Sequence, residues 1–230
     1  MPAKSYTLYE PLGVTLIISP WNYPFLLAID PIIGAMAAGN TIILKASRKS
    51  KYTTELLKDI LNSNFDPKYL FVVDNEQVSH DELLSYNYDH IFYTGGYKVG
   101  KHIMEVASKN LSKVTLELGG KSPTIVDKEA NTELAARSIA WGNTVNAGQT
   151  CVSPDYILVH SSIKEKFINE LQKALFDFYG VDSIRNKDYP KIIDSNHLDK
   201  LVNLLEDQDI IYGGKFDRNL CKLEPTIVDN

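Results

Sequence analysis

Val14-Thr15-Leu16-Ile17-Ile18 and, further along, Thr41-Ile42-Ile43-Leu44 are the two stretches that decide the fold. Both runs are nearly continuous and rich in β-branched residues, which is typical of strands buried on both faces in parallel sheets. Between them, residues 29–38 are small and apolar with Pro31 near the start, so we predict a helix that packs on the sheet. Asn40 is a plausible left-handed cap at its end. A strand, a helix and a second buried strand predict an open α/β sheet.

The same alternation of strands and helices continues along the chain. Further strands are expected at residues 69–73, 90–93, 114–118, 124–126 and 156–159. Helices are expected from Ser50 or Thr53 onward, from a Thr132 cap to 141, from a Ser161 or Ser162 cap to 179, and at 81–84, 98–109 and 195–205. After Gly119-Gly120 a new series of strand and helix patterns begins. We therefore expect one domain at residues 1–121 and a second at residues 122–230.

The composition argues against several classes of protein. The chain has 230 residues, 44% of them hydrophobic, which suits one large domain or two small ones with buried cores. Its 24 basic and 29 acidic residues give a net charge of −5, which argues against nucleic-acid binding and suits a cytoplasmic protein. The two cysteines form no metal or disulfide pattern, so no metal is expected. We also expect no signal peptide and no transmembrane segment, because no run reaches the roughly 18 apolar residues that span a bilayer.

Cys151 lies in an unusual segment for a buried cysteine. Residues 146–156 form a turn-like stretch, Asn-Ala-Gly-Gln-Thr-Cys-Val-Ser-Pro-Asp-Tyr, between a helical pattern and a strand pattern. A structural cysteine usually lies in an apolar run and behaves as a small hydrophobic residue. On spacing alone, a buried or incidental cysteine is still the more common case, because reactivity depends on a stabilised thiolate. The alternative is an exposed and reactive thiol.

Several polar residues and glycines follow predicted strands, at the edge where open α/β sheets bind ligands. They are Asn22, Lys45, Ser47, Gly95, Gly96 and Glu117. Asn22 is either a turn residue or an amide donor to an oxyanion, and Lys45 is either a surface lysine or a donor to a ribose or phosphate. Glu117 either faces solvent or acts as a general base. The Gly95-Gly96 turn is either an ordinary tight turn or a helix start whose N–H groups face a phosphate.

Five motifs follow one another along the chain. They are Ser19-Pro20-Trp21-Asn22-Tyr23-Pro24, Ala38-Gly39-Asn40 through Leu44-Lys45-Ala46-Ser47, Phe92-Tyr93-Thr94-Gly95, Leu116-Glu117-Leu118-Gly119-Gly120-Lys121-Ser122-Pro123 and Asn146-Ala147-Gly148-Gln149-Thr150-Cys151. Together and in this order, they resemble the aldehyde dehydrogenase superfamily. The last two are most similar to the class 3 and fatty aldehyde dehydrogenase branch. The resemblance implies a Rossmann-like open parallel sheet that forms an incomplete cofactor domain, followed by part of an α/β catalytic domain.

The resemblance also implies a chemistry. Cys151 would attack an aliphatic or aromatic aldehyde to give a thiohemiacetal, and Asn22 would hold the oxyanion together with the backbone N–H of Cys151. Hydride transfer to NAD or NADP would leave a thioester, and Glu117 would activate the water that hydrolyses it to a carboxylate. Cofactor contacts are implied for Trp21, Lys45, Ser47, Arg48, Gly95, Gly96, Val99, Leu118 and Gly119.

Three departures from the family pattern bear on activity. Arg48 replaces a glutamate that contacts the ribose hydroxyls, which leaves NAD or NADP open and could favour the phosphate of NADP. Gly96 replaces a common serine and so removes a possible phosphate contact. The chain also matches the middle of the pattern, without the motif whose glutamate holds the nicotinamide ribose. We therefore expect either an aldehyde dehydrogenase that needs a complementary fragment, as full-length members oligomerise, or a non-catalytic remnant that at most binds a nucleotide or a partner chain.

Overall fold

The computed structural model describes residues 3–74 and 77–229. The chain divides after Gly119 into two compact units, one up to that residue and one from Gly120 onward. Each unit has its own hydrophobic core and its own sheet structure. Among the described residues, no helix combines the length and the apolar character needed to cross a bilayer.

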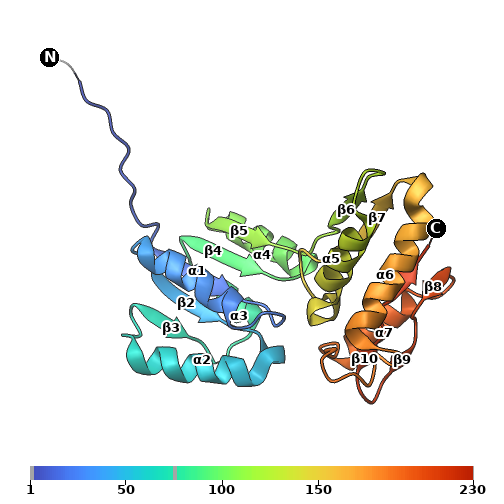
Figure 1. The fold of residues 1–230 in the computed structure, drawn as a ribbon. Helices are drawn as coiled ribbons and strands as arrows, with labels where there is room; N and C mark the ends of the chain where they lie inside the picture. Colours follow the sequence, from blue (N-terminus) through green and yellow to red (C-terminus); the bar gives the residue numbers. More distant parts are fainter. Residues whose placement is uncertain (1–2, 75–76, 230) are drawn as a thin grey trace. The chain divides into compact units, whose positions relative to one another are not determined.

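The first unit is built on a five-stranded sheet in the order β3-β2-β1-β4-β5, in which every strand pair is parallel (Figure 1). The strands are β1 (Val14–Ile18), β2 (Thr41–Lys45), β3 (Leu70–Val72), β4 (His90–Thr94) and β5 (Lys113–Glu117). The chain first winds outward from β1 through β2 to β3, then returns to add β4 and β5 on the other side. The strand order therefore reverses at β1, and the carboxyl ends of β1 and β4 flank the crevice where such sheets bind ligands.

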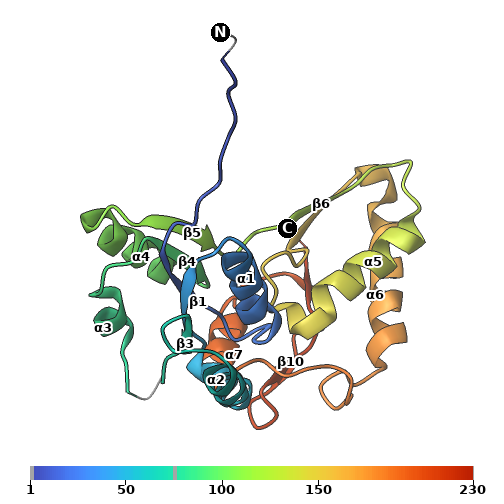
Figure 2. The same ribbon diagram turned by 90° about the vertical axis from the view of Figure 1, so that its left-hand side faces the viewer.

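Helices cover both faces of this sheet, as Figure 2 shows for α1 and α4. The helices are α1 (Leu26–Ala37), α2 (Lys51–Asn64), α3 (His80–Leu84) and α4 (Tyr97–Lys109). Side chains of β1 alternate between two cores: Leu16 packs in the core with α3 and α4, and Ile17 packs in the core with α1 and α2. Both are 0% exposed, which explains why the β1 sequence is apolar along its length.

The predicted strands are all present in the first unit, but two helix boundaries differ from expectation. Helix α1 begins at Leu26, three residues before the predicted start, and carries Pro31 in its interior. Asn40 is not the left-handed cap: Gly39 has the positive φ, +80°, and Asn40 is buried. The Asn40 side chain instead accepts hydrogen bonds from the N–H groups of Leu12 and Gly13, and donates one to the carbonyl of Ala35.

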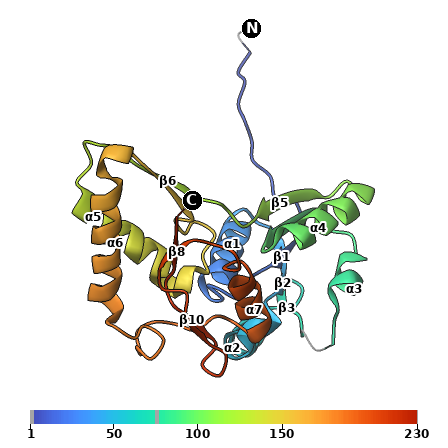
Figure 3. The same ribbon diagram turned by 90° about the vertical axis from the view of Figure 1, so that its right-hand side faces the viewer.

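In its described residues, the second unit has three short strand pairs and three α-helices; Figure 3 shows α5, α6 and α7. The pair β6 (Pro123–Val126) and β7 (Tyr156–Val159) is parallel, whereas β8 (Ile210–Tyr212) with β11 (Ile227–Val228) and β9 (Phe216–Asp217) with β10 (Lys222–Leu223) are antiparallel. The helices are α5 (Thr132–Thr144), α6 (Lys164–Tyr179) and α7 (Ser195–Asn203). Helices α5 and α6 pack against each other and against one face of β6 and β7.

The helix caps of the second unit differ from those predicted. Asn131, not Thr132, caps α5, because its side chain accepts a hydrogen bond from the N–H of Leu134. A short 3-10 turn at Ser161–Ile163 precedes α6, and His160 caps that turn. In both cases the residue just before the predicted cap supplies the acceptor, which is the usual uncertainty of a helix start.

Candidate active site

Seven of the predicted cofactor residues line one cleft of about 330 Å³ in the first unit. They are Trp21, Lys45, Ser47, Arg48, Gly95, Gly96 and Val99. They lie on segments that follow β1, β2 and β4, which are neighbouring parallel strands. Since the carboxyl ends of parallel strands meet at one edge of a sheet, residues that are far apart in the sequence share this cleft.

Lys45 is a buried lysine at the end of β2. It is 1% exposed, and its Nζ donates a hydrogen bond to the carbonyl of Val78 at 3.1 Å. Burial lowers the pKa of the Lys45 amine, and the nearby charge of Arg48 lowers it further. A surface lysine would keep its charged end in water. Lys45 instead presents its amine at the cleft, where an anionic or hydroxylated ligand would compensate for the lost hydration.

The charge of this cleft is one-sided. Three of its lining residues, Lys45, Arg48 and Lys49, carry basic side chains, and the Lys49 amine lies 5.8 Å from the ring centre of Trp21. Among the described residues that line the cleft, none is an aspartate or glutamate. A cavity with several cations and no acid on its walls suits a ligand with phosphate groups.

The Gly95-Gly96 turn joins the cleft to the start of α4. The N–H of Gly95 donates to the carbonyl of Glu117 at 2.9 Å, and a side chain at position 95 would collide with the hydroxyl of Tyr93. Gly96 is the N-terminal cap of α4, which runs for 13 residues, and no side chain of the described chain caps this end. A Cβ at position 96 would meet open space, so the backbone is accessible there. The site therefore fits the diphosphate of a dinucleotide, whose oxygens can accept the free N–H groups of a helix start.

In the second unit, Cys151 follows a strained turn. Asn146, Ala147 and Gly148 have φ values of +52°, +52° and +74°, so two consecutive residues with side chains adopt the left-handed conformation. Each such residue costs of order 1 kcal/mol, and such strain is concentrated at functional sites. Cys151 itself is a free and exposed thiol. Of the two possibilities for Cys151, a buried cysteine or an exposed thiol, the structure has the exposed thiol.

Gln149 holds this turn in place, a role that the sequence did not reveal. Its Nε2 donates to the carbonyls of Asn146 and Lys191, at 2.9 and 3.1 Å, and its Oε1 accepts from the N–H of Ile193 at 2.9 Å. The partners at positions 191 and 193 are more than 40 residues away in sequence, so spacing alone gives no signal for them. The side chain therefore fixes the peptide segment that presents Cys151.

Cys221 offers a comparison within the same unit. It is also a free thiol, but it is only partly exposed and packs beside the small core formed by Ile192, Leu198 and Leu223. Burial raises the pKa of the Cys221 thiol, with a further contribution from Asp194. A raised pKa reduces the thiolate fraction, so Cys221 has the features of a structural cysteine.

The remaining predicted site residues lie outside the cleft lining. Asn22 is half-buried in the bend after β1, and Glu117 is exposed at the end of β5. Leu118 packs against the core of β4 and α4, where a Cβ at position 100 would lie 2.8 Å from its Cδ2. Gly119 is the last residue of the first unit. Asn22 and Glu117 thus belong to the first unit and Cys151 to the second.

Comparison with known proteins gives the family. The model of the aldehyde dehydrogenase family matches residues 1–230, the whole chain. This chain belongs to the aldehyde dehydrogenase family. The aldehyde dehydrogenase named dimeric NADP-preferring from Rattus norvegicus is 45% identical over 223 residues, which cover 97% of this chain and 49% of the relative. Aldehyde dehydrogenase family 3 member A2 from Mus musculus is 43% identical over 228 residues, covering 99% of this chain and 47% of the relative.

The fold agrees with that assignment. The solved substrate-bound state of AldH from Staphylococcus aureus superposes with a TM-score of 0.89 at 43% identity, covering 95% of this chain and 48% of that chain. This chain therefore spans about half the length of the relatives it matches. Both the α/β fold with a parallel sheet and the resemblance to the class 3 branch are confirmed.

Proposed function

We propose that this chain carries the nucleophile and the cofactor cleft of an NAD(P)-dependent aldehyde dehydrogenase, which oxidises an aldehyde to a carboxylic acid. The observation that carries the proposal is the exposed Cys151 thiol on a left-handed turn that Gln149 holds in place. The cationic cleft of the first unit supports the cofactor part of the proposal. The names of the matched relatives support the substrate class.

In the first step, the Cys151 thiol gives its proton to solvent, and the resulting thiolate sulfur attacks the aldehyde carbon. A carbon–sulfur bond forms while the π electrons of the carbonyl move to oxygen, which gives a tetrahedral thiohemiacetal anion. The amide of Asn22 and the N–H of Cys151 are the proposed donors to this oxyanion. Donors held in place before the reaction stabilise developing charge at little reorganisation cost.

The second half of the proposed reaction releases the acid. When bound, the nicotinamide of the dinucleotide supplies the acceptor for the hydride that leaves the tetrahedral carbon. The carbon–oxygen double bond reforms, and Cys151 is left as a thioester. Glu117 then takes a proton from water, whose oxygen attacks the thioester carbon and expels the Cys151 thiolate. Glu117 is exposed at the end of β5, which leaves it accessible to water.

The cofactor cleft supplies binding and orientation. Lys45 is the proposed contact to the adenosine ribose, and the Gly95-Gly96 turn with the start of α4 is the proposed contact to the diphosphate. Ser47, Trp21 and Val99 line the same cleft. Arg48 introduces a cation beside Lys45, which favours NADP over NAD because the extra phosphate carries negative charge.

Covalent trapping of Cys151 tests this function independently of turnover. The chain is incubated with a medium-chain aldehyde and NAD or NADP, and the intact mass is measured for an acyl adduct. We expect the adduct in the unmodified chain and in Cys221→Ser, and no adduct in Cys151→Ala. An acyl adduct that persists in Cys151→Ala would contradict the nucleophile assignment, and an acyl adduct that forms without dinucleotide would contradict the proposed hydride transfer.

A second candidate function is that of a fragment which binds a complementary chain. The strands β6 and β7 form an isolated parallel pair whose outer face is apolar and uncovered: Ile125 is 76% exposed and Leu158 is 54% exposed. Parallel sheets are normally covered on both faces, and a two-stranded sheet is marginally stable alone. Both features favour a partner that supplies the missing layer.

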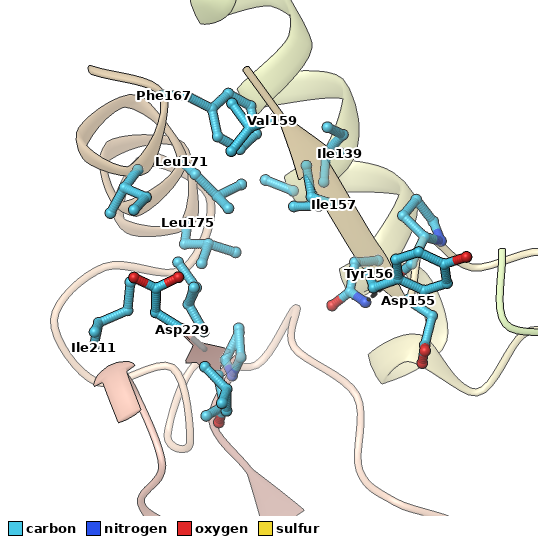
Figure 4. A pocket seen from close by; sticks show the side chains of 18 of the residues that line it. Ile139, Asp155, Tyr156, Ile157, Val159, Phe167, Leu171, Leu175, Ile211 and Asp229 are labelled. Atoms are coloured by element: carbon cyan, nitrogen blue, oxygen red, sulfur yellow. Dashed lines mark hydrogen bonds between the residues drawn. The ribbon is translucent and has the colours of Figure 1, made fainter. Parts of the chain in front are cut away.

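A cleft beside β7 supports the same partner. It measures about 480 Å³ and is lined by apolar residues of β7 and α6 on one side and of β11 on the other. Figure 4 shows Ile157, Leu171 and Leu175 directed into it. At one end, the Lys164 amine pairs with the Asp229 carboxylate at 2.8 Å. An extended apolar strand from a complementary aldehyde dehydrogenase chain fits such a space, because its backbone could pair with the edge of β7.

Binding of the complementary half of a relative tests this partner. The tagged C-terminal half of the S. aureus AldH is mixed with the chain, and co-purification is measured. We expect capture of the unmodified chain and of Val181→Lys, a control whose 86% exposed side chain lies elsewhere on the surface. We expect loss of capture for the double variant Ile125→Lys, Leu158→Lys. Equal capture of all three proteins would exclude the uncovered sheet face as the docking surface.

The compartment is also a proposal. Both cysteines are free, and the chain carries a net charge of −5. Free thiols suit a reducing compartment, where a nucleophilic cysteine stays available. We therefore propose that the protein acts in the cytoplasm, which fractionation with an antibody to the chain would test.

A further inference from the structure

His80 lines the cofactor cleft but has no role in the mechanism above. It is the first residue of α3, and the hydroxyl of Ser79 caps that helix by accepting a hydrogen bond from the N–H of Glu82 at 3.1 Å. The cap fixes the backbone from which the imidazole projects. The ring is half-buried, so it can contact a ligand in the cleft without being sealed in the core.

Lys45 links the end of β2 to the segment that precedes His80. Its amine belongs to β2, and it donates to the carbonyl of Val78, two residues before His80. Lys45, Arg48 and His80 therefore present three nitrogen-bearing side chains to one cavity whose described lining contains no carboxylate. Two basic side chains and one titratable ring make a site for a dianion rather than for a neutral ligand.

The charged groups around His80 come from four elements. Lys45 from β2 and Arg48 from the turn after it are positive, as is His102 from α4 when protonated, and Asp81 is the adjacent residue on α3. The Asp81 carboxylate lies 3.1 Å from the Nε2 of His102. Burial lowers the pKa of His80 most, followed by Lys45 and Arg48, while Asp81 opposes them. In the free protein His80 is therefore mostly neutral near pH 7.

We propose that His80 is a specificity-determining residue that binds the 2′-phosphate of NADP together with Arg48 and Lys45, and that it takes up a proton as the phosphate binds. The proposal rests on the proposed cofactor role of this cleft. It predicts that the preference for NADP over NAD is itself dependent on pH. Arg48 supplies a constant charge, and His80 supplies a charge that the ligand induces.

The sign of the pH effect follows from linkage. A bound dianion stabilises the imidazolium, so the pKa of His80 is higher in the complex than in the free protein. Affinity for the phosphorylated ligand then rises as pH falls from the pKa in the complex to the pKa in the free protein, and it levels off below that. Each pH unit between the pKa of His80 in the complex and its pKa in the free protein changes the affinity by about tenfold. The phosphate itself gains a proton near about pH 6, so the measurement belongs above that value.

Calorimetric titration of the whole chain tests the proposal. The ligands are adenosine 2′,5′-bisphosphate and 5′-AMP, which lack the nicotinamide, measured from about pH 6.5 to about pH 8.5 at constant ionic strength. We expect the affinity for the bisphosphate to fall by about tenfold or more across this range and that for 5′-AMP to stay constant. Buffers of different ionisation enthalpy should show proton uptake with the bisphosphate only.

Three variants assign the effect. His80→Gln should abolish both the pH dependence and the proton uptake, and Arg48→Gln should weaken the bisphosphate at every pH while keeping the pH dependence. His102→Gln is the matched control, because this second histidine pairs with Asp81 outside the cleft lining, and it should keep the pH dependence.

Two results would overturn the inference in different ways. The first is tight binding of the bisphosphate without pH dependence, or a pH dependence that persists in His80→Gln. Either would show that His80 does not bind the phosphate, and neither would contradict the proposed function. Failure of both nucleotides to bind would overturn this inference and the proposed cofactor role of the cleft together.

Discussion

Gly120 lies beside the backbone of Cys151, the proposed nucleophile. A Cβ at position 120 would lie 2.8 Å from the carbonyl oxygen of Cys151, whereas a Cβ at position 119 would have no atom within 4 Å. There is thus room for a side chain at position 119 but not at position 120. Gly120 lets the backbone pass beside the segment that carries the thiol, and a side chain there must displace that segment.

We predict that Gly120→Ala destabilises the second unit by about 1–3 kcal/mol, the usual cost of inserting an atom into a filled space. Urea unfolding followed by the fluorescence of Trp141, in a Trp21→Phe background, measures it. Gly119→Ala is the matched control and should stay within about 0.5 kcal/mol. Equal stability of the two variants would show that the Cys151 segment yields to the added methyl group.

The side-chain hydrogen bonds of Gln149 give a second prediction. Gln149→Ala removes three hydrogen bonds that hold the turn before Cys151, each worth about 1 kcal/mol. We expect amide hydrogen exchange of residues 146–153 to accelerate by about tenfold or more. Gln172→Ala, which removes one 3.3 Å bond to the carbonyl of Ile211, is the control and should leave that exchange unchanged. Unchanged exchange in Gln149→Ala would mean that the turn is held by its other contacts.

These residues also show where prediction from the sequence ends. The polar residues around Cys151 raised an exposed thiol as the alternative to the more common buried cysteine, and the thiol is exposed. The burial of Lys45 was not predicted, since its acceptor is the carbonyl of Val78, 33 residues further on. The partners of Gln149 are equally remote. Roles that depend on a distant backbone atom leave no trace in local spacing.

Among the elements, β1 is the strand most completely determined by its sequence. Its bounds, Val14–Ile18, are those predicted, because an apolar run with a glycine before it and a proline after it has one stable placement, at the centre of a parallel sheet. The start of α1 was misjudged because Pro31 was taken to mark the first turn. The helix tolerates Pro31 further along, at the loss of one backbone hydrogen bond.

The buried side chain of Asn40 joins α1 to the segment that leads into β1. Its side chain is 6% exposed and serves the N–H groups of Leu12 and Gly13 and the carbonyl of Ala35. Asn40→Ala should destabilise the first unit by about 2–4 kcal/mol, because these groups lose their partner in a buried place. Urea unfolding followed by Trp21 fluorescence, in a Trp141→Phe background, measures it.

Asn64→Ala is the control for that experiment. Its side chain is exposed and bonds only within its own helix, to the carbonyl of Ile60. We expect a change of less than about 0.5 kcal/mol. A loss for Asn40→Ala no larger than this would show that water reaches the Leu12 and Gly13 amides.

In the second unit, the uncovered face of β6 and β7 is the feature on which the proposed partner chain depends. The chain spans about half the length of its relatives, and the second unit exposes apolar strand surface beside an apolar cleft. We predict that repeated turnover by the pure chain, followed as NAD(P)H production from a medium-chain aldehyde, is weak or absent, since hydride transfer needs precise positioning of both reactants. A single slow hydride transfer per chain is still enough to leave the acyl adduct on Cys151. Absorbance at the NAD(P)H band measures it, and turnover at the rate of an ordinary full-length enzyme would contradict the prediction.

The left-handed pair Asn146 and Ala147 has a consequence for how this protein can be improved. A glycine at position 147 would adopt the same backbone without the steric cost of a Cβ, so selection for heat resistance alone should favour it. The same change would give the peptide before the thiol more freedom. A substitution that raises thermostability at this turn is therefore expected to lower catalytic activity. A library of variants screened only for survival at high temperature should gain stability and lose activity.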